Sequence, residues 1–197
     1  MKNKYSKIAI LLAVIFSIFF IYSGIKGTIQ GNWKNLWLAI LGLVNMAIPF
    51  IITYIANKKN IYLPSTFQFI TIIFLFFASY LGEINNFYIT YWWFDLFLHI
   101  VFGFYGVIIS IHLVKGIITK ENNISNKRLN FFIALFAFSF TVTLGTFWEM
   151  FEFSVDYIFK TGLVKGGLED TSTDLLVKIG AALLSSIIYY YKQKKKQ

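Results

Sequence analysis

Apolar residues dominate this 197-residue chain and fall into six long runs separated by short polar segments. Each run holds about 17 to 25 residues, enough for an α-helix to cross the hydrocarbon core of a bilayer. The runs are apolar on all sides, as expected of helices that satisfy their own backbone hydrogen bonds in lipid. They predict an all-α, polytopic membrane protein with six transmembrane helices at about residues 8–24, 36–56, 66–82, 94–114, 129–153 and 174–191.

The first run resembles a secretory signal sequence, because Lys2, Lys4 and Lys7 precede it. No small-x-small cleavage site follows Tyr22, so we interpret the run as an uncleaved first helix. The chain shows no internal repeat, low-complexity tract or long linker. We therefore expect a single transmembrane domain over residues 1–197.

The distribution of positive charge predicts the orientation. If the N-terminus is cytoplasmic, thirteen of the 18 basic residues lie on the inner side: Lys2, Lys4, Lys7, Lys58, Lys59, Lys115, Lys120, Lys127, Arg128, Lys192, Lys194, Lys195 and Lys196. The other five lie outside or just within the outer helix ends: Lys26, Lys34, Lys160, Lys165 and Lys178. Positive charge favours cytoplasmic segments, so both termini are predicted to be cytoplasmic.

Composition narrows the picture further. The chain is 57% hydrophobic, only 14% charged and without cysteine, which excludes a disordered chain, a disulfide-stapled secreted fold and a thiolate metal site. The net charge of +9 is explained by topology and by attraction to anionic lipids, so we expect membrane lipids and not nucleic acid as partners. The indoles fall at the predicted outer boundary, which Trp favours: Trp33, Trp37, Trp92, Trp93 and Trp148.

Acidic residues concentrate on the predicted outer side, and their spacing is informative. Eight of the nine lie there: Glu83, Asp95, Glu149, Glu152, Asp156, Glu169, Asp170 and Asp174. Asp95 and His99 are four residues apart, so they share one helix face. Glu149 and Glu152 are three residues apart near the outer end of the next helix. Asp170 and Asp174 are four residues apart at the start of the last helix. Three helices therefore bring acidic groups and one imidazole to a similar depth.

A divalent metal ion would compensate this charge. A carboxylate near hydrocarbon costs about 2.5–3.5 kcal/mol, so such groups are paired or functional. Histidine nitrogen with carboxylate oxygen suits zinc, manganese or iron, whereas carboxylates alone suit magnesium or calcium. The candidate metal ligands are Asp95, His99, Glu149, Glu152, Asp170 and Asp174. Glu149 and Glu152 are also the candidate catalytic bases acting on metal-bound water.

Structural explanations exist for the same residues. Glu149 and Glu152 could form ion pairs with Lys178 or Lys165, and Asp170 with Thr171 could cap the last helix. Three glycines are predicted to permit close helix packing: Gly103, Gly145 and Gly180. For an anionic lipid or lipid-linked substrate, the candidate contacts are Lys165, Trp148 and Thr171.

Three motifs carry a resemblance over residues 80–185. In order, they are Asp95-x-x-x-His99-x-x-x-Gly103, Phe147-Trp148-Glu149-x-x-Glu152-Phe153, and Asp170-Thr171-x-x-Asp174 followed by Gly180-Ala181. The chain thereby resembles the YjdF-like family of bacterial inner-membrane proteins, and it is similar in outline to VanZ-like proteins. The resemblance implies the fold and the positions of the site, and it implies no particular activity.

These patterns favour a membrane protein with a metal-dependent hydrolytic or transfer site that opens to the outer leaflet and acts on a lipid or lipid-linked envelope precursor. A non-catalytic binding or resistance protein would use the same residues without turnover. A proton- or ion-coupled transporter would also place acids and a histidine within its spans. Against a transporter, the acids cluster at one end and no internal symmetry is found.

Overall fold

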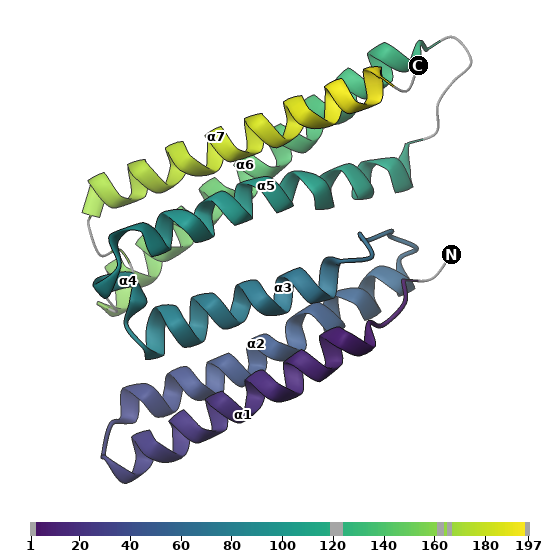
Figure 1. Cartoon of the computed structure of the whole chain (residues 1–197). Helices are drawn as coiled ribbons and strands as arrows, with labels where there is room; N and C mark the ends of the chain where they lie inside the picture. Colours follow the sequence, from purple (N-terminus) through teal and green to yellow (C-terminus); the bar gives the residue numbers. More distant parts are fainter. Residues whose placement is uncertain (1–2, 119–123, 161–163, 165–166, 196–197) are drawn as a thin grey trace. The chain divides into compact units, whose positions relative to one another are not determined.

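The computed structural model describes residues 3–118, 124–160, 164 and 167–195. Within those ranges, six helical stretches are long and apolar enough to span a membrane (Figure 1). This confirms the prediction of an all-α, polytopic membrane protein. The chain divides after Phe94 into two compact units, and each is described by itself. A single domain and cytoplasmic termini stay predictions.

The first unit consists of helices joined by short turns. A helical hairpin begins it, and Gly31 at the turn has a φ of +67°, a conformation that glycine adopts without strain. Ser6 caps the first helix, with its side chain accepting a hydrogen bond from the Ala9 N–H. The elements are α1 (Lys7–Ile29), α2 (Trp33–Lys58), α3 (Phe67–Phe76), the π-helical η1 (Phe77–Ile84) and the short α4 (Phe87–Thr90).

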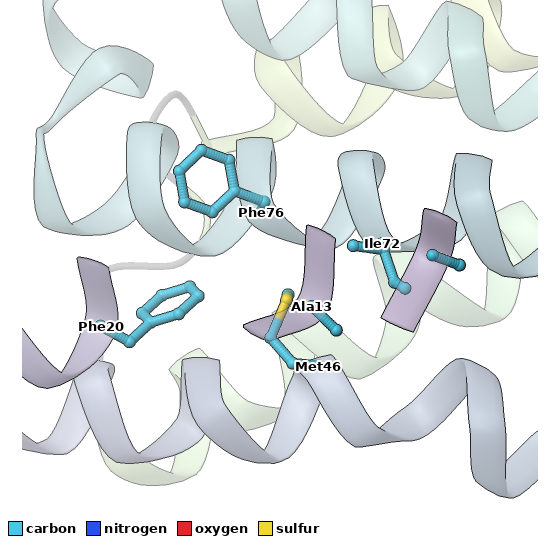
Figure 2. Packing of buried hydrophobic residues seen from close by; sticks show 6 residues of the cluster. Ala13, Phe20, Met46, Ile72 and Phe76 are labelled. Atoms are coloured by element: carbon cyan, nitrogen blue, oxygen red, sulfur yellow. The ribbon is translucent and has the colours of Figure 1, made fainter. Parts of the chain in front are cut away.

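Aromatic and small residues fill the core of the first unit. Phe20, Met46 and Ile72 are buried between α1, α2 and α3 (Figure 2). Phe76 stacks on Phe16, with ring centroids 3.8 Å apart. A Cβ at Gly42 would lie 2.1 Å from the Phe20 ring, so glycine is needed for this close approach.

The second unit is built on three long helices, and it carries the candidate site. Glycines on α5 let its neighbours come close: a Cβ at Gly103 would lie 2.6 Å from the Lys178 carbonyl oxygen, and one at Gly106 would lie 2.7 Å from the Thr141 side chain. Helix α5 therefore packs against both other helices. They are α5 (Trp92–Ile117), α6 (Asn126–Phe159) and α7 (Gly167–Lys194). Their apolar core includes Val107, Ile133 and Ala182.

The observed helices are longer than the predicted ones. The helix predicted at 129–153 covers Asn126–Phe159, and the one predicted from residue 174 begins at Gly167. Apolar runs end at the first charged residues, but a helix continues through them because its hydrogen bonds are made by the backbone. The idea that Asp170 and Thr171 cap α7 is therefore wrong, since they lie after the start of the helix.

The predicted packing glycines divide into two groups. Gly103 meets the α7 backbone, and a Cβ at Gly145 would lie 3.2 Å from the Lys178 side chain, so both permit close packing as expected. Gly180 is exposed and has nothing within 4 Å of the Cβ position, so its predicted role in packing is wrong. Gly180 lies on the exposed face of α7, away from the buried residues of that helix. The helical periodicity of the sequence alone would have indicated this.

Candidate functional site

Three side chains from two helices converge at one end of the second unit. Asp95 and His99 are the fourth and eighth residues of α5, and Asp174 is the eighth residue of α7. The His99 Nε2 atom is 3.3 Å from Asp95 Oδ1 and 3.2 Å from Asp174 Oδ2. His99 and Asp174 are buried, with 9% and 4% of their surface exposed, and Asp95 is half-buried. One ligand atom from each residue lies within 4.8 Å of the other two. These three residues are called the His–Asp trio below.

The geometry of the trio could hold a metal ion. Both carboxylates face the same ring nitrogen, which carries at most one proton. The two distances exceed the 2.7–2.9 Å usual for charge-assisted hydrogen bonds. Ligands about 2.1 Å from a tetrahedral metal lie about 3.4 Å from one another, close to the two distances observed. One nitrogen and two carboxylate oxygens also match the donors of zinc, manganese and iron sites.

Local sequence explains why these residues meet. Asp95, His99 and Gly103 follow one another at intervals of four, so they lie on one face of α5. Because Gly103 lacks a side chain, the α7 backbone approaches α5 directly after the histidine. That approach brings Asp174, one turn before Lys178, within reach of the imidazole.

A buried ion pair lies beside the trio on α6 and α7. The Lys178 ammonium donates a hydrogen bond to Glu149 Oε1, and both residues are buried, with exposed fractions of 3% and 4%. The lysine stem passes Gly145, one turn before Glu149 on α6. Of the alternatives for Glu149, the ion pair with Lys178 is therefore the arrangement present.

Glu152 is a second carboxylate on α6, close in sequence to Glu149. It is half-buried, three residues after Glu149 and four residues after Trp148 on the same helix. Trp148 is half exposed, and its ring lies 5.8 Å from that of Phe151.

Comparison with known proteins places the chain in a family. Residues 8–195 match the DUF2238 family, described as predicted membrane proteins. The chain belongs to this family. A protein of Thermotoga maritima, described as uncharacterized, is 30% identical to this DUF2238 protein over 119 residues, which are 60% of the chain and 59% of that relative. The chain thus spans about 59% of the relative's length. No solved structure matches.

Family membership and six apolar spans identify this DUF2238 protein as a multi-pass integral membrane protein. Its remaining candidate residues lie around the trio without joining it. Asp170 and Thr171 are half-buried in the α7 turn before Asp174. In the part of the chain that the structure describes, Glu149, Glu152 and Asp170 are not grouped with the trio's ligand atoms. Lys165 lies outside the described residues.

The sequence offers Lys178 of this DUF2238 protein as one of two possible ion-pair partners of Glu149 and Glu152, and the structure shows the pair with Glu149. Its spacing was the available signal: Lys178 follows Asp174 by four residues, on the same face of a helix that is otherwise apolar at that depth. A lysine inside a span is costly, and a nearby acidic partner is the usual reason for it.

Proposed function

We propose that this protein binds a divalent transition-metal ion at the His–Asp trio and uses it in hydrolysis or group transfer on a lipid or lipid-linked substrate. One observation carries the proposal: two carboxylates converge on a single imidazole nitrogen, 3.3 and 3.2 Å away, in a largely buried position. With neutral His99, the trio has a charge of −2, which a divalent cation balances. The first and third motifs of the resemblance to the YjdF-like family contain these three residues.

The surrounding residues support a division of roles. A bound divalent ion would polarise a substrate oxygen and acidify a water molecule. Asp95, His99 and Asp174 would hold it, with the imidazole deprotonated at Nε2. Glu149 is bonded to Lys178, so Glu152 is the carboxylate better placed to accept a proton from that water.

The depth of the trio favours an amphipathic substrate. Asp95 and His99 are the fourth and eighth residues of α5, so they lie within about 11 Å of its beginning. Trp92 and Trp93 start that helix and are 82% and 48% exposed, as expected at a membrane interface. A lipid headgroup lies at this depth. With the predicted orientation, the site opens to the outer leaflet.

Metal binding is tested by titration of the purified full-length protein with Mn²⁺ and Zn²⁺ in mild detergent. We expect one ion per chain, and a loss of affinity of at least 100-fold in His99→Ala and Asp174→Asn. Glu169→Gln is the matched control, because it removes an exposed carboxylate from the first turn of the same helix. Equal affinity in all four proteins, or no binding by the wild type, would refute the metal site.

Turnover is tested separately, with lipid phosphates and lipid esters in mixed micelles. Removal of a general base typically costs 10²–10⁴-fold in rate. We therefore expect Glu152→Gln to lose most of the metal-dependent turnover while it still binds Mn²⁺. Metal binding without turnover of any such lipid would refute the enzymatic part and favour the non-catalytic binding protein. Movement of the ion across a vesicle membrane would favour the transporter instead.

A further inference from the structure

Basic side chains from two helices meet at the end of the second unit opposite the His–Asp trio. Arg128 is the third residue of α6, and Lys192 is the third residue from the end of α7. The two helices run antiparallel, with the start of α6 beside the end of α7 (Figure 1). The Phe131 ring on α6 lies 6.2 Å from the Tyr190 ring on α7, so these two helix ends are in contact.

The alignment of the two helices brings four positive charges to one level. In an antiparallel pair, the turn before Phe131 lies level with the turn after Tyr190. Residues 124–130 and 190–195, which form these two ends, contain no aspartate or glutamate, so no carboxylate within them balances the charge. The basic residues concerned are all exposed and are called the basic rim: Lys127, Arg128, Lys192 and Lys194.

Aromatic side chains adjoin the basic rim on the side of the membrane interior. Phe131 and Tyr191 are 58% and 57% exposed, and the Tyr190 ring lies 5.7 Å from the Tyr191 ring. These three residues are called the aromatic floor. Each of them lies within about one turn of a basic residue of its own helix. Rim and floor together form an amphipathic surface, with positive charge at the helix ends and apolar rings deeper along the helices.

We propose that this surface binds one anionic phospholipid, with the phosphate group at Arg128 and Lys192 and an acyl chain against the aromatic floor. A guanidinium offers paired hydrogen bonds to phosphate oxygens, and an ammonium adds a compact positive charge. Clusters of basic residues next to transmembrane helices, and basic pockets between such helices, bind anionic lipid headgroups. Here two helices supply both kinds of basic side chain at one level.

The combination of rim and floor favours a lipid over a soluble acidic partner. A soluble partner would cover the charges and leave the rings of the aromatic floor uncovered, whereas one phospholipid covers both. This lipid is distinct from the substrate proposed for the trio, because α7 rises about 27 Å between Asp174 and Lys192. The inference therefore goes beyond the proposed metal site. With the predicted orientation, the bound lipid belongs to the cytoplasmic leaflet.

The test is native mass spectrometry of the full-length protein in mild detergent, titrated with dioleoylphosphatidylglycerol or dioleoylphosphatidylcholine. The two lipids have the same acyl chains and differ in the net charge of the headgroup. We expect the wild type to bind its first phosphatidylglycerol at least tenfold more tightly than its first phosphatidylcholine. Arg128→Gln with Lys192→Gln should reduce this preference to less than twofold, because both phosphate contacts are removed.

Lys58→Gln with Lys59→Gln is the matched control, because it removes two positive charges from exposed positions at the end of α2, outside the second unit. It should keep the wild-type preference for phosphatidylglycerol. An unchanged unfolding midpoint, followed by Trp fluorescence, shows that each variant keeps its fold. Equal affinity of the wild type for the two lipids would overturn the inference and favour a soluble acidic partner. A preference that persists in the Arg128 and Lys192 variant, or that falls equally in the control, would also overturn it, because net charge and not this surface would then select the lipid.

Discussion

Removing the positive charge of Lys178 should destabilise the protein strongly. Its ammonium bonds to Glu149, and the two residues are 3% and 4% exposed. In Lys178→Met the carboxylate keeps its desolvation cost and loses its counter-ion, a change that typically costs about 3–5 kcal/mol. For a chain of this size each kcal/mol corresponds to about 2–4 °C in the unfolding midpoint. We therefore expect the midpoint to fall by roughly 6–20 °C.

The second variant in the experiment separates charge from packing. Lys178→Met combined with Glu149→Leu removes both charges, and replacement of a whole buried pair by apolar residues is often neutral or stabilising. The double variant should therefore be more stable than Lys178→Met alone. The assay is thermal unfolding in detergent followed by Trp fluorescence, with the exposed Lys34→Met as control. The single variant Glu149→Leu completes the cycle; losses in the two single variants that add up to the loss in the double variant would refute the reasoning, because they would mean that the two side chains do not interact.

The remaining predictions concern helix packing and orientation. Gly103→Val should lower the free energy of unfolding by about 1–3 kcal/mol, because its Cβ would lie 2.6 Å from the Lys178 carbonyl oxygen. Gly180→Val has open space at the Cβ position, so it should leave the unfolding midpoint unchanged. The chain has no cysteine, so single cysteines report topology directly. In intact cells an impermeant maleimide should label Lys34→Cys and should label Lys59→Cys only after permeabilisation; the reverse pattern would overturn the predicted orientation.

Much of the fold follows from the sequence because the bilayer restricts what a chain can do. An apolar run in lipid must satisfy its backbone hydrogen bonds within a helix, so six such runs predicted six transmembrane helices. The structure has six helices long and apolar enough to span a membrane. The ends of the helices were less predictable. In α6 and α7, polar residues such as Glu169 and Asp156 continue the helix, and hydropathy gives no signal for where the backbone hydrogen bonds end.

The candidate site was predictable in part. Spacing placed Asp95 beside His99, because residues four apart on a helix are neighbours whatever surrounds them. Which residue of α7 meets the imidazole depends on the register of two packed helices, and Gly103 sets that register. The sequence therefore offered Asp170 and Asp174 equally, whereas the structure brings Asp174 to His99.

The pairing of Glu149 with Lys178 shows the same limit. Spacing along α6 treats Glu149 and Glu152 as equivalent carboxylates one turn apart. Only the packing of α6 against α7 distinguishes them, because it buries Glu149 against Lys178 and leaves Glu152 half-buried beside Trp148. Roles that depend on contacts between helices need the tertiary structure.

The identity of the metal ligands is the most direct test of this account. Mn²⁺ bound to the purified protein can be examined by pulsed electron paramagnetic resonance, which detects a directly coordinated imidazole nitrogen. The account predicts one histidine nitrogen coupled to the ion in the wild type and in His112→Gln, and its loss in His99→Gln. A bound ion with no nitrogen coupling, or a coupling that persists in His99→Gln, would contradict the proposal that Asp95, His99 and Asp174 form a metal centre.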